Sequence, residues 1–199
     1  MSEPVTQVGE AIHDLHERYR DCMACRLSRT RERIVGSRGC TNSPIVLISD
    51  RVSGHDEQTD MLLSGPVDQL ITNILIAPKV ELDPADIYYA SLVLCRTPVG
   101  RPAVPCESNA CAARLREELT LVKPRAIVML GPVTGKALFP NGDTGQSIDL
   151  DGRRVPTWCT VHPREGLWGT REKITGAKRE MYRDWQEIAA GIRSIADTG

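Results

Sequence analysis

The spacing of four cysteines constrains the fold of this chain more than any other feature of its sequence. Cys22 and Cys25 form a Cys-x-x-Cys pair, and Cys95 and Cys111 stand far downstream, each with a basic residue nearby. A Cys-x-x-Cys pair at a helix end can hold one metal from two adjacent positions, and two further thiolates complete a four-sulfur set. The spacing therefore predicts one metal centre built from three distant segments.

The spacing does not name the metal. Zinc and an iron–sulfur cluster both accept four cysteines, and a structural role without metal is a third interpretation. Cys40, Cys106 and Cys159 are left over. Cys159 falls in an expected strand, where we expect it to pack, whereas Cys106 is close enough to Cys111 to compete as the fourth ligand.

Length and composition indicate a soluble globular protein. A chain of 199 residues is long enough for one domain with a full core, and we expect a single domain over residues 1–199. The net charge is -1, the hydrophobic content is 41%, and no apolar run reaches the roughly 18 residues of a membrane span. Because no secretory signal is visible, we expect a reducing cytoplasmic location without disulfides.

Apolar runs and helical spacings alternate along the chain. We expect strands at residues 44–50, 87–94, 126–130 and 155–161. We expect helices at residues 5–20, 66–76, 108–122 and 131–138 and around residues 181–192, with loops at residues 95–105 and 140–152. This alternation predicts an α/β fold, a three-layer α/β/α sandwich with a central, mostly parallel sheet.

Two polar side chains stand where strands of such a sheet end. Asp50 closes the first apolar run, and His162 follows the last one in the sequence Thr160-Val-His-Pro163. A parallel sheet presents functional residues at its carboxyl edge. A lone histidine is more often structural, but its place at a strand tip favours a functional role.

Taken in order, the motifs resemble a known family. They are Cys22-x-x-Cys25-x-Leu27, Arg33-Ile-Val-Gly36-x-x-Gly39, Cys95-Arg96, Cys111, Leu130-Gly131 and Thr160-Val-His162-Pro163. From about Tyr19 to Ala189 the chain resembles the family 4 (iron–sulfur) uracil-DNA glycosylases. The resemblance implies a uracil-DNA glycosylase-like domain with its core at about residues 19–192. It also implies a structural [4Fe-4S] cluster, with zinc as the alternative, on Cys22, Cys25, Cys95 and Cys111.

The resemblance further implies a monofunctional DNA glycosylase that flips a nucleotide into a pocket and leaves an abasic site. Asp50 falls at the acidic position of the family if the first strand is aligned without a gap. There it would polarise a water and stabilise the cationic sugar, while His162 would donate a hydrogen bond or proton to the departing base. An alignment that keeps Gly54 in register would instead place Arg51 at the acidic position.

The expected base pocket, formed by Arg51, Leu63 and Ser91, departs from the family pattern. Leu63 stands in place of the aromatic residue that stacks on uracil, and Ser91 in place of the asparagine that reads its edge. Without the amide, the site loses much of its discrimination for uracil. We therefore expect a modified base bulkier than uracil, one setting being hypermodified phage DNA and antiviral defence. The alternatives are a conventional uracil-DNA glycosylase, a catalytically silent iron–sulfur DNA-binding module and a zinc-binding regulatory protein.

We expect the partner to be DNA, with no membrane and a monomeric state. Leu167 and Trp168 are candidates to wedge into the duplex, and Arg164 and Arg171 to contact phosphates. Lys136 is a further phosphate candidate. For Leu167 and Trp168 the alternative is a hydrophobic loop anchor, and an exposed helical lysine such as Lys136 often has no role in binding.

Overall fold

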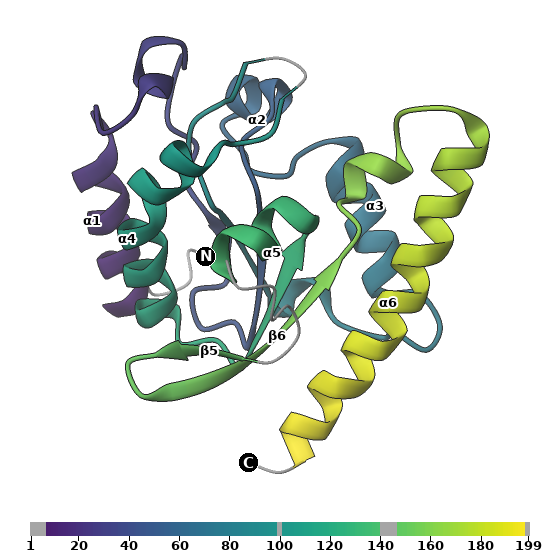
Figure 1. Cartoon of the computed structure of the whole chain (residues 1–199). Coiled ribbons are helices and arrows are strands. Elements are labelled where there is room, and N and C mark those ends of the chain that lie inside the picture. The colour runs from purple at the N-terminus through teal and green to yellow at the C-terminus, as the bar shows by residue number, and fades with distance from the viewer. Residues whose placement is uncertain (1–6, 99–100, 140–146, 198–199) are drawn as a thin grey trace, which may run out of the picture.

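The computed structural model describes residues 7–98, 101–139 and 147–197. Its centre is a six-stranded sheet in the order β1-β3-β2-β4-β6-β5 (Figure 1). The strands are β1 (Arg38–Gly39), β2 (Ile45–Ser49), β3 (Ile87–Ser91), β4 (Ala126–Leu130), β5 (Ser147–Leu150) and β6 (Arg153–Thr160). The inner strands β3, β2, β4 and β6 are parallel to one another, and the edge strands β1 and β5 run antiparallel to their neighbours.

Helices cover both faces of this sheet. They are α1 (Gln7–Tyr19), α2 (Gly54–Thr59), α3 (Pro66–Leu75), α4 (Pro105–Val122), α5 (Pro132–Leu138) and α6 (Arg171–Asp197), with short 3-10 helices at Arg26–Arg29, Pro84–Asp86 and Pro163–Gly166. One face packs against α3 and α6, and the other against α1 and α4. Within the described ranges, no helix is both long enough and apolar enough to cross a membrane.

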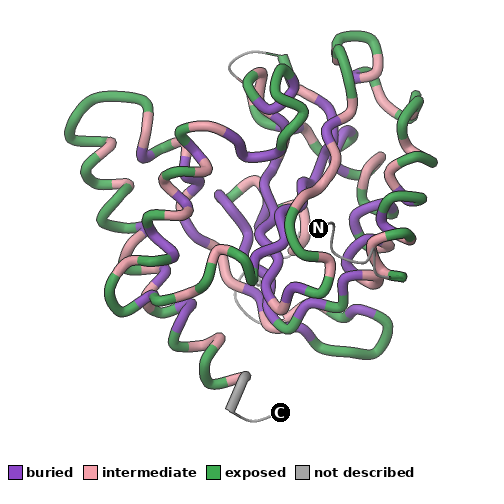
Figure 2. The backbone as a smooth tube through the Cα atoms, turned by 180° about the vertical axis from the view of Figure 1, so that it is seen from behind, coloured by how far each residue is buried: buried purple, intermediate pink, exposed green. Residues whose placement is uncertain are grey.

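The apolar runs of the sequence became the buried centre of the sheet. Every residue of β2, β3 and β4 is buried, as is typical of parallel strands covered on both faces. Figure 2 shows these buried strands between helices whose outer sides are exposed. The expected α/β fold with a mostly parallel sheet is confirmed, whereas the extent of a single domain over residues 1–199 stays a prediction.

Several expected boundaries were wrong. β3 ends at Ser91 rather than at residue 94, because the carbonyls of Ser91 and Leu92 accept hydrogen bonds from the guanidinium group of Arg114. α4 begins at Pro105 rather than at residue 108, since Glu107 accepts a hydrogen bond from the Val104 N–H and caps the first turn. The stretch at residues 140–152, expected as a loop, contains β5, which forms a hairpin with β6; residues 140–146 lie outside the described residues.

A buried ion pair joins three elements beneath the carboxyl edge of the sheet. Arg114 and Glu118 on α4 are almost fully buried and contact each other. Glu118 also accepts a hydrogen bond from the Tyr88 hydroxyl at 2.7 Å and lies 3.3 Å from Nε2 of His16. Burial raises the pKa of Glu118, but the Arg114 charge and the His16 contact outweigh it and hold that pKa below its ordinary value. The pair therefore ties α1, α4 and β3 together.

We expect Arg114→Met to destabilise the protein by about 3–5 kcal/mol, because it leaves the Glu118 carboxylate buried without its cation. The matched control is Arg116→Met on the same helix, where an exposed pair with Asp151 should contribute less than about 1 kcal/mol. Urea denaturation followed by circular dichroism measures both. Equal midpoint shifts for the two variants would show that the buried pair is dispensable.

Candidate active site and cysteine cluster

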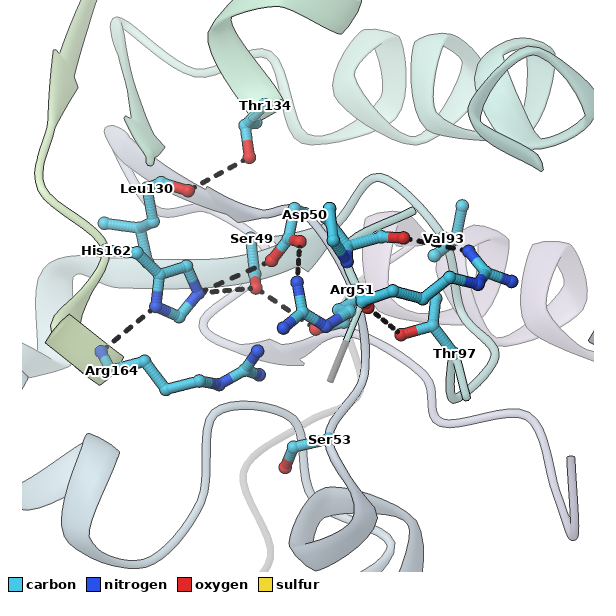
Figure 3. Close-up of polar contacts among 12 residues, drawn as sticks. Ser49, Asp50, Arg51, Ser53, Val93, Thr97, Leu130, Thr134, His162 and Arg164 are labelled. Atoms are coloured by element: carbon cyan, nitrogen blue, oxygen red, sulfur yellow. Dashed lines mark hydrogen bonds and ion pairs between the residues drawn. The ribbon is translucent and has the colours of Figure 1, made fainter. Parts of the chain in front are cut away.

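The fold brings Asp50 and His162 together at the carboxyl edge of the sheet. Asp50 follows β2, His162 follows β6, and β4 lies between these two strands. Nε2 of His162 is 3.6 Å from Oδ1 of Asp50, and both side chains are buried (Figure 3). Sequence spacing placed each residue at a strand end, and the parallel topology makes them neighbours.

Two hydrogen bonds fix the protonation of the His162 ring. The backbone N–H of Arg164 donates to Nδ1 at 3.1 Å, so the neutral ring carries its proton on Nε2. Nε2 lies 3.3 Å from the Ser49 hydroxyl, which donates its own proton to the Arg51 carbonyl. Ser49 therefore accepts from His162 and holds the ring in place, a role that the sequence did not reveal.

His162 is neutral at physiological pH. Burial and, to a lesser extent, the positive charges of Arg164 and Arg51 together lower the pKa of His162 to about 3. A neutral imidazole with its proton on Nε2 can donate a hydrogen bond toward Asp50 and the adjoining pocket. The ring therefore acts as an uncharged donor rather than as an imidazolium acid.

The position of His162 requires a glycine at residue 131. Gly131 has φ +86°, and a Cβ atom there would lie 3.1 Å from Cβ of His162. The short turn from β4 into α5 thus combines a left-handed backbone with a close approach of the histidine. The Leu130-Gly131 pair of the sequence motif marks this turn.

Asp50 has two different carboxylate oxygens. Oδ2 pairs with the guanidinium group of the adjacent Arg51. Oδ1 is buried and accepts no hydrogen bond from any described residue. A buried carboxylate oxygen without a donor is costly to maintain, which is typical of a group kept for chemistry rather than for stability.

A pocket of about 570 Å³ opens beside this pair. This volume falls within the range of about 300–1,000 Å³ that is typical of small-molecule sites. Its described lining residues are Asp50, Arg51, Pro102, Leu130, Gly131, Pro132, Val133, Val161, His162, Arg164, Glu165 and Glu180. Among them there is no phenylalanine, tyrosine or tryptophan, and no asparagine or glutamine.

Leu63 and Ser91, expected in the base pocket, do not line it. Leu63 is buried in the core with φ +53°. Ser91 is fully buried, and its hydroxyl donates to the Val93 carbonyl at 2.9 Å. Ser91 pairs with Ser49 in the sheet, so it lies next to the site without facing the pocket. Of the three expected pocket residues, only Arg51 lines the pocket.

Sequence reasoning missed two buried carboxylates on α2. Asp56 accepts hydrogen bonds from the backbone N–H groups of Ser53 and Ser64, each at 2.8 Å. Glu57 accepts from the Glu32 N–H at 2.8 Å and pairs with Arg96 at 3.3 Å. These bonds fix the chain that follows Asp50 and Arg51. The Ser53 capping box was the available sequence signal.

The candidate DNA contacts differ in their surroundings. Arg164 lines the pocket, whereas Lys136 and Arg171 are exposed on helices. Leu167 is half-buried and packs against the core, as its anchor interpretation expects. Trp168 is 57% exposed, which leaves its ring free to meet a partner.

The four expected metal ligands converge. Cys25, Cys95 and Cys111 pack with Leu27, Val93 and Ala103 in one small cluster. Burial raises the pKa of the Cys95 thiol to about 11, and Cys111 and Cys25 are among the neighbours that raise it. Burial also raises the pKa of Cys111, with Cys25 and Cys22 contributing. Neighbouring thiols, of which Cys95 is buried and the other three are half-buried, are a donor set that suits a metal able to convert them to thiolates.

The leftover cysteines stand apart from this cluster. Cys106 is exposed one and a half turns before Cys111 on α4, and Cys40 is exposed as well, which favours Cys111 over Cys106 as the fourth ligand. Cys159 is half-buried at the edge of the core, as expected. All seven thiols are free. In the part of the chain that the structure describes, no three candidate ligand side chains are already closed around a metal position.

Glu107 holds the segments around the cysteine cluster. It is fully buried and accepts hydrogen bonds from Arg26 at 3.0 Å and from Arg101 at 2.7 and 2.8 Å. Arg26 adjoins Cys25, and Arg101 belongs to the loop after Cys95. The Arg101 hydrogen bonds outweigh burial and lower the pKa of Glu107 to about 2. One carboxylate on α4 thus gathers all three cysteine-bearing segments.

A family model for the uracil DNA glycosylase superfamily matches residues 37–186. The chain belongs to this superfamily. It is 29% identical to a type-4 uracil-DNA glycosylase of Thermotoga maritima, over 92% of this chain and 96% of the relative. Type-4 uracil-DNA glycosylases of Pyrobaculum aerophilum and Archaeoglobus fulgidus are 26% and 25% identical, over 72% and 80% of this chain and 68% and 84% of the relatives. The resemblance to family 4 read from the motifs is confirmed.

We expect His162→Asn to flatten the pH dependence of stability. Because the folded protein keeps His162 neutral, the unfolded chain binds the extra proton as pH falls below about 6.5, and the folded state loses stability down to about pH 3. Between pH 6.5 and 4.5 this amounts to about 2 kcal/mol. Glu107 and Glu118, whose pKa values are lowered from 4.5, also destabilise the folded state as pH falls toward and below 4.5, but they do so equally in wild type and variant and cancel in the comparison.

Urea unfolding at half-unit pH steps measures the effect. The wild-type free energy of unfolding should fall toward pH 4.5 more steeply than that of His162→Asn. Parallel curves would mean that the folded protein binds a proton at His162 as readily as the unfolded chain does.

Proposed function

We propose that this protein is a monofunctional DNA glycosylase that flips a nucleotide, hydrolyses its N-glycosidic bond and leaves an abasic site. The observation that carries the proposal is the meeting of Asp50 and neutral His162 on the wall of one pocket. Superfamily membership supports glycosylase chemistry. The Asp50 position also supports the ungapped alignment, in which the acidic residue of the family is Asp50 and not Arg51.

The two groups divide the reaction between them. Asp50 lines the pocket, and its Oδ1 is buried without a donor among the described residues, so the carboxylate would polarise a water and stabilise positive charge on the sugar. As the C–N bond breaks, its electron pair stays with the base. Water adds to the sugar carbon through its oxygen, and the proton that it loses ends on the released base anion. The Nε2–H of His162 donates a hydrogen bond to the base atom that gains negative charge.

We propose that the excised base is modified and bulkier than uracil. The described lining offers no phenylalanine, tyrosine or tryptophan ring to stack on uracil and no side-chain amide to read its edge. A second pocket of about 460 Å³, between the start of α4 and α5, shares Val133 with the first and gives room for a substituent. Hypermodified phage DNA, and with it antiviral defence, is the setting that we propose.

For DNA binding, we propose that Arg164 and Arg171 contact phosphates, that Trp168 wedges into the duplex with Leu167 anchoring its loop, and that Lys136 contributes a more distant charge. The exposed ring of Trp168 beside the half-buried Leu167 supports this division. A cytoplasmic monomer is consistent with seven free thiols.

We propose a structural [4Fe-4S] cluster on Cys22, Cys25, Cys95 and Cys111. The convergence of the four thiols and the match to type-4 relatives support it. When bound, the cluster would cross-link the three segments that carry its ligands. Zinc on the same cysteines is the alternative.

A catalytically silent DNA-binding module is the second candidate. The Arg51–Asp50 ion pair favours it, because a guanidinium group on the carboxylate weakens its pull on a water or a cationic sugar. A conventional uracil-DNA glycosylase is a third possibility, which the pocket lining disfavours.

We expect the wild-type protein to form alkali-cleavable abasic sites in one or more genomic DNAs that carry natural base modifications. Asp50→Asn and His162→Ala should each reduce the rate by about 100-fold or more, the usual contribution of a positioned acid or base. Gel analysis of alkali-treated DNA measures cleavage. The matched control is Arg154→Gln, an exposed arginine at the amino end of β6.

Uracil in a defined oligonucleotide is the reference substrate. Faster excision of uracil than of any modified base would refute the modified-base proposal. Intact DNA binding without abasic sites on any DNA would favour the silent module.

We expect the purified protein to be brown, with broad absorbance near the boundary of the visible and ultraviolet. Cys111→Ser should reduce the iron content, because it removes one of four ligands. Cys106→Ser on the same helix is the matched control and should keep the iron. A colourless wild-type protein that contains one zinc would refute the cluster and support the zinc alternative. Loss of iron in Cys106→Ser alone would show that Cys106 is the fourth ligand.

A further inference from the structure

A second hollow of about 250 Å³ lies beside the base pocket and contains three arginines. Its lining residues are Arg51, Val52, Ser53, Gly54, Arg96, Thr97, Pro98 and Arg164. We call it the arginine hollow. Arg51 and Arg164 line both the arginine hollow and the base pocket, so the two cavities adjoin. The proposed hydrolysis does not use Arg96 or this space.

The described lining of the arginine hollow contains three arginines and no carboxylate. Arg51 pairs with Asp50, and Arg96 pairs with Glu57. The guanidinium group of Arg164 donates no hydrogen bond to any described residue. Burial is the main cause that lowers the pKa of Arg164; the charge of Arg51 also lowers it, while Asp50, Asp56 and Glu165 raise it. Figure 3 shows the ends of the Arg51 and Arg164 side chains turned toward the same space.

The walls of the arginine hollow are held by the fold. Val52 and Arg96 form a parallel bridge that continues the pairing of β2 and β3. Arg96 is anchored by the buried Glu57 and lies against Gly54, where a Cβ atom would come within 3.5 Å of its guanidinium group. The Ser53 hydroxyl accepts from the Asp56 N–H and donates to no described residue, so its proton is available.

We propose that the arginine hollow is a phosphodiester subsite that takes the DNA phosphate next to the flipped nucleotide. The inference rests on the proposed function, and it adds a specific place for the backbone. In a nucleotide the phosphate is one sugar away from the base, which matches two adjoining cavities that share two residues. Guanidinium forks fit pairs of phosphate oxygens, and a phosphate would relieve the repulsion between Arg51 and Arg164.

The test pairs arginine variants with neutralised phosphates. The probe is a duplex that carries one tetrahydrofuran abasic analogue, with a single methylphosphonate placed in turn at each of the three linkages on either side of it. For wild type, one linkage beside the analogue should weaken binding by about tenfold, the size of a lost charge-assisted hydrogen bond. In Arg164→Gln and Arg51→Gln, the same methylphosphonate should cost less than twofold.

Arg154→Gln, away from this edge, is the control and should keep the tenfold loss. Thermal melting confirms that each variant folds, and two arginine variants guard against a local collapse at one position. If a methylphosphonate weakens binding equally in wild type and in both variants at every linkage, the phosphate subsite is overturned. The remaining ligand for the arginine hollow would then be an anionic group on the base. Preference of wild type for the furan duplex over undamaged duplex tests the proposed function separately, since it does not depend on which linkage is neutral.

Discussion

The buried Arg114–Glu118 pair is the constraint on which the rest of the structure depends. A charge pair in a dry interior is tolerated only when most of its hydrogen bonds are made. Here Tyr88, His16 and the carbonyls at the end of β3 supply the partners, and Nε of Arg114 alone has none among the described residues. Those partners come from α1, α4 and the central sheet. The pair therefore fixes where β3 ends and where the chain turns toward Cys95, which places the cysteine cluster next to the catalytic edge.

Buried carboxylates repeat this arrangement on the way to the active site. Glu107 gathers the segments around the cysteines, and Glu57 joins Arg96 to the backbone of Glu32. Arg96 directly follows Cys95 and pairs with Val52 near Asp50. A movement at the cysteines would thus reach the Asp50 loop through one short segment. Through this connection, a metal bound at the cysteines would influence activity by holding the Asp50 loop in place, without taking part in the reaction.

Sequence patterns were most informative where local chemistry decides the structure. The apolar run of β2, the Gly-Pro start of α3 and the strand-end positions of Asp50 and His162 follow from composition and periodicity alone. The end of β3 could not be foreseen, because its carbonyls accept hydrogen bonds from Arg114, far along the chain. The helix α2 and the hairpin of β5 rest on local pairing, and their sequence signals were missed. The prediction of the pocket lining failed because a position at a strand end does not fix what a side chain contacts. Ser91 occupies such a position, but its hydroxyl donates to the Val93 carbonyl, whereas Ser49 on the neighbouring strand contacts His162.

The neutral state of His162 limits which bases the proposed reaction can release. An imidazole with a pKa near 3 does not supply a proton as an imidazolium would; it can only stabilise negative charge by donating its Nε2–H. The departing base must therefore carry an acceptor that gains charge as the bond breaks and that reaches Nε2 in place of Ser49. Selectivity then rests on the geometry of one donor and on the space around it, rather than on an amide that reads the base edge. A site of this kind tolerates substituents elsewhere on the base. Apart from Asp50 and His162, the polar side chains among its described lining residues are the charged groups Arg51, Arg164, Glu165 and Glu180.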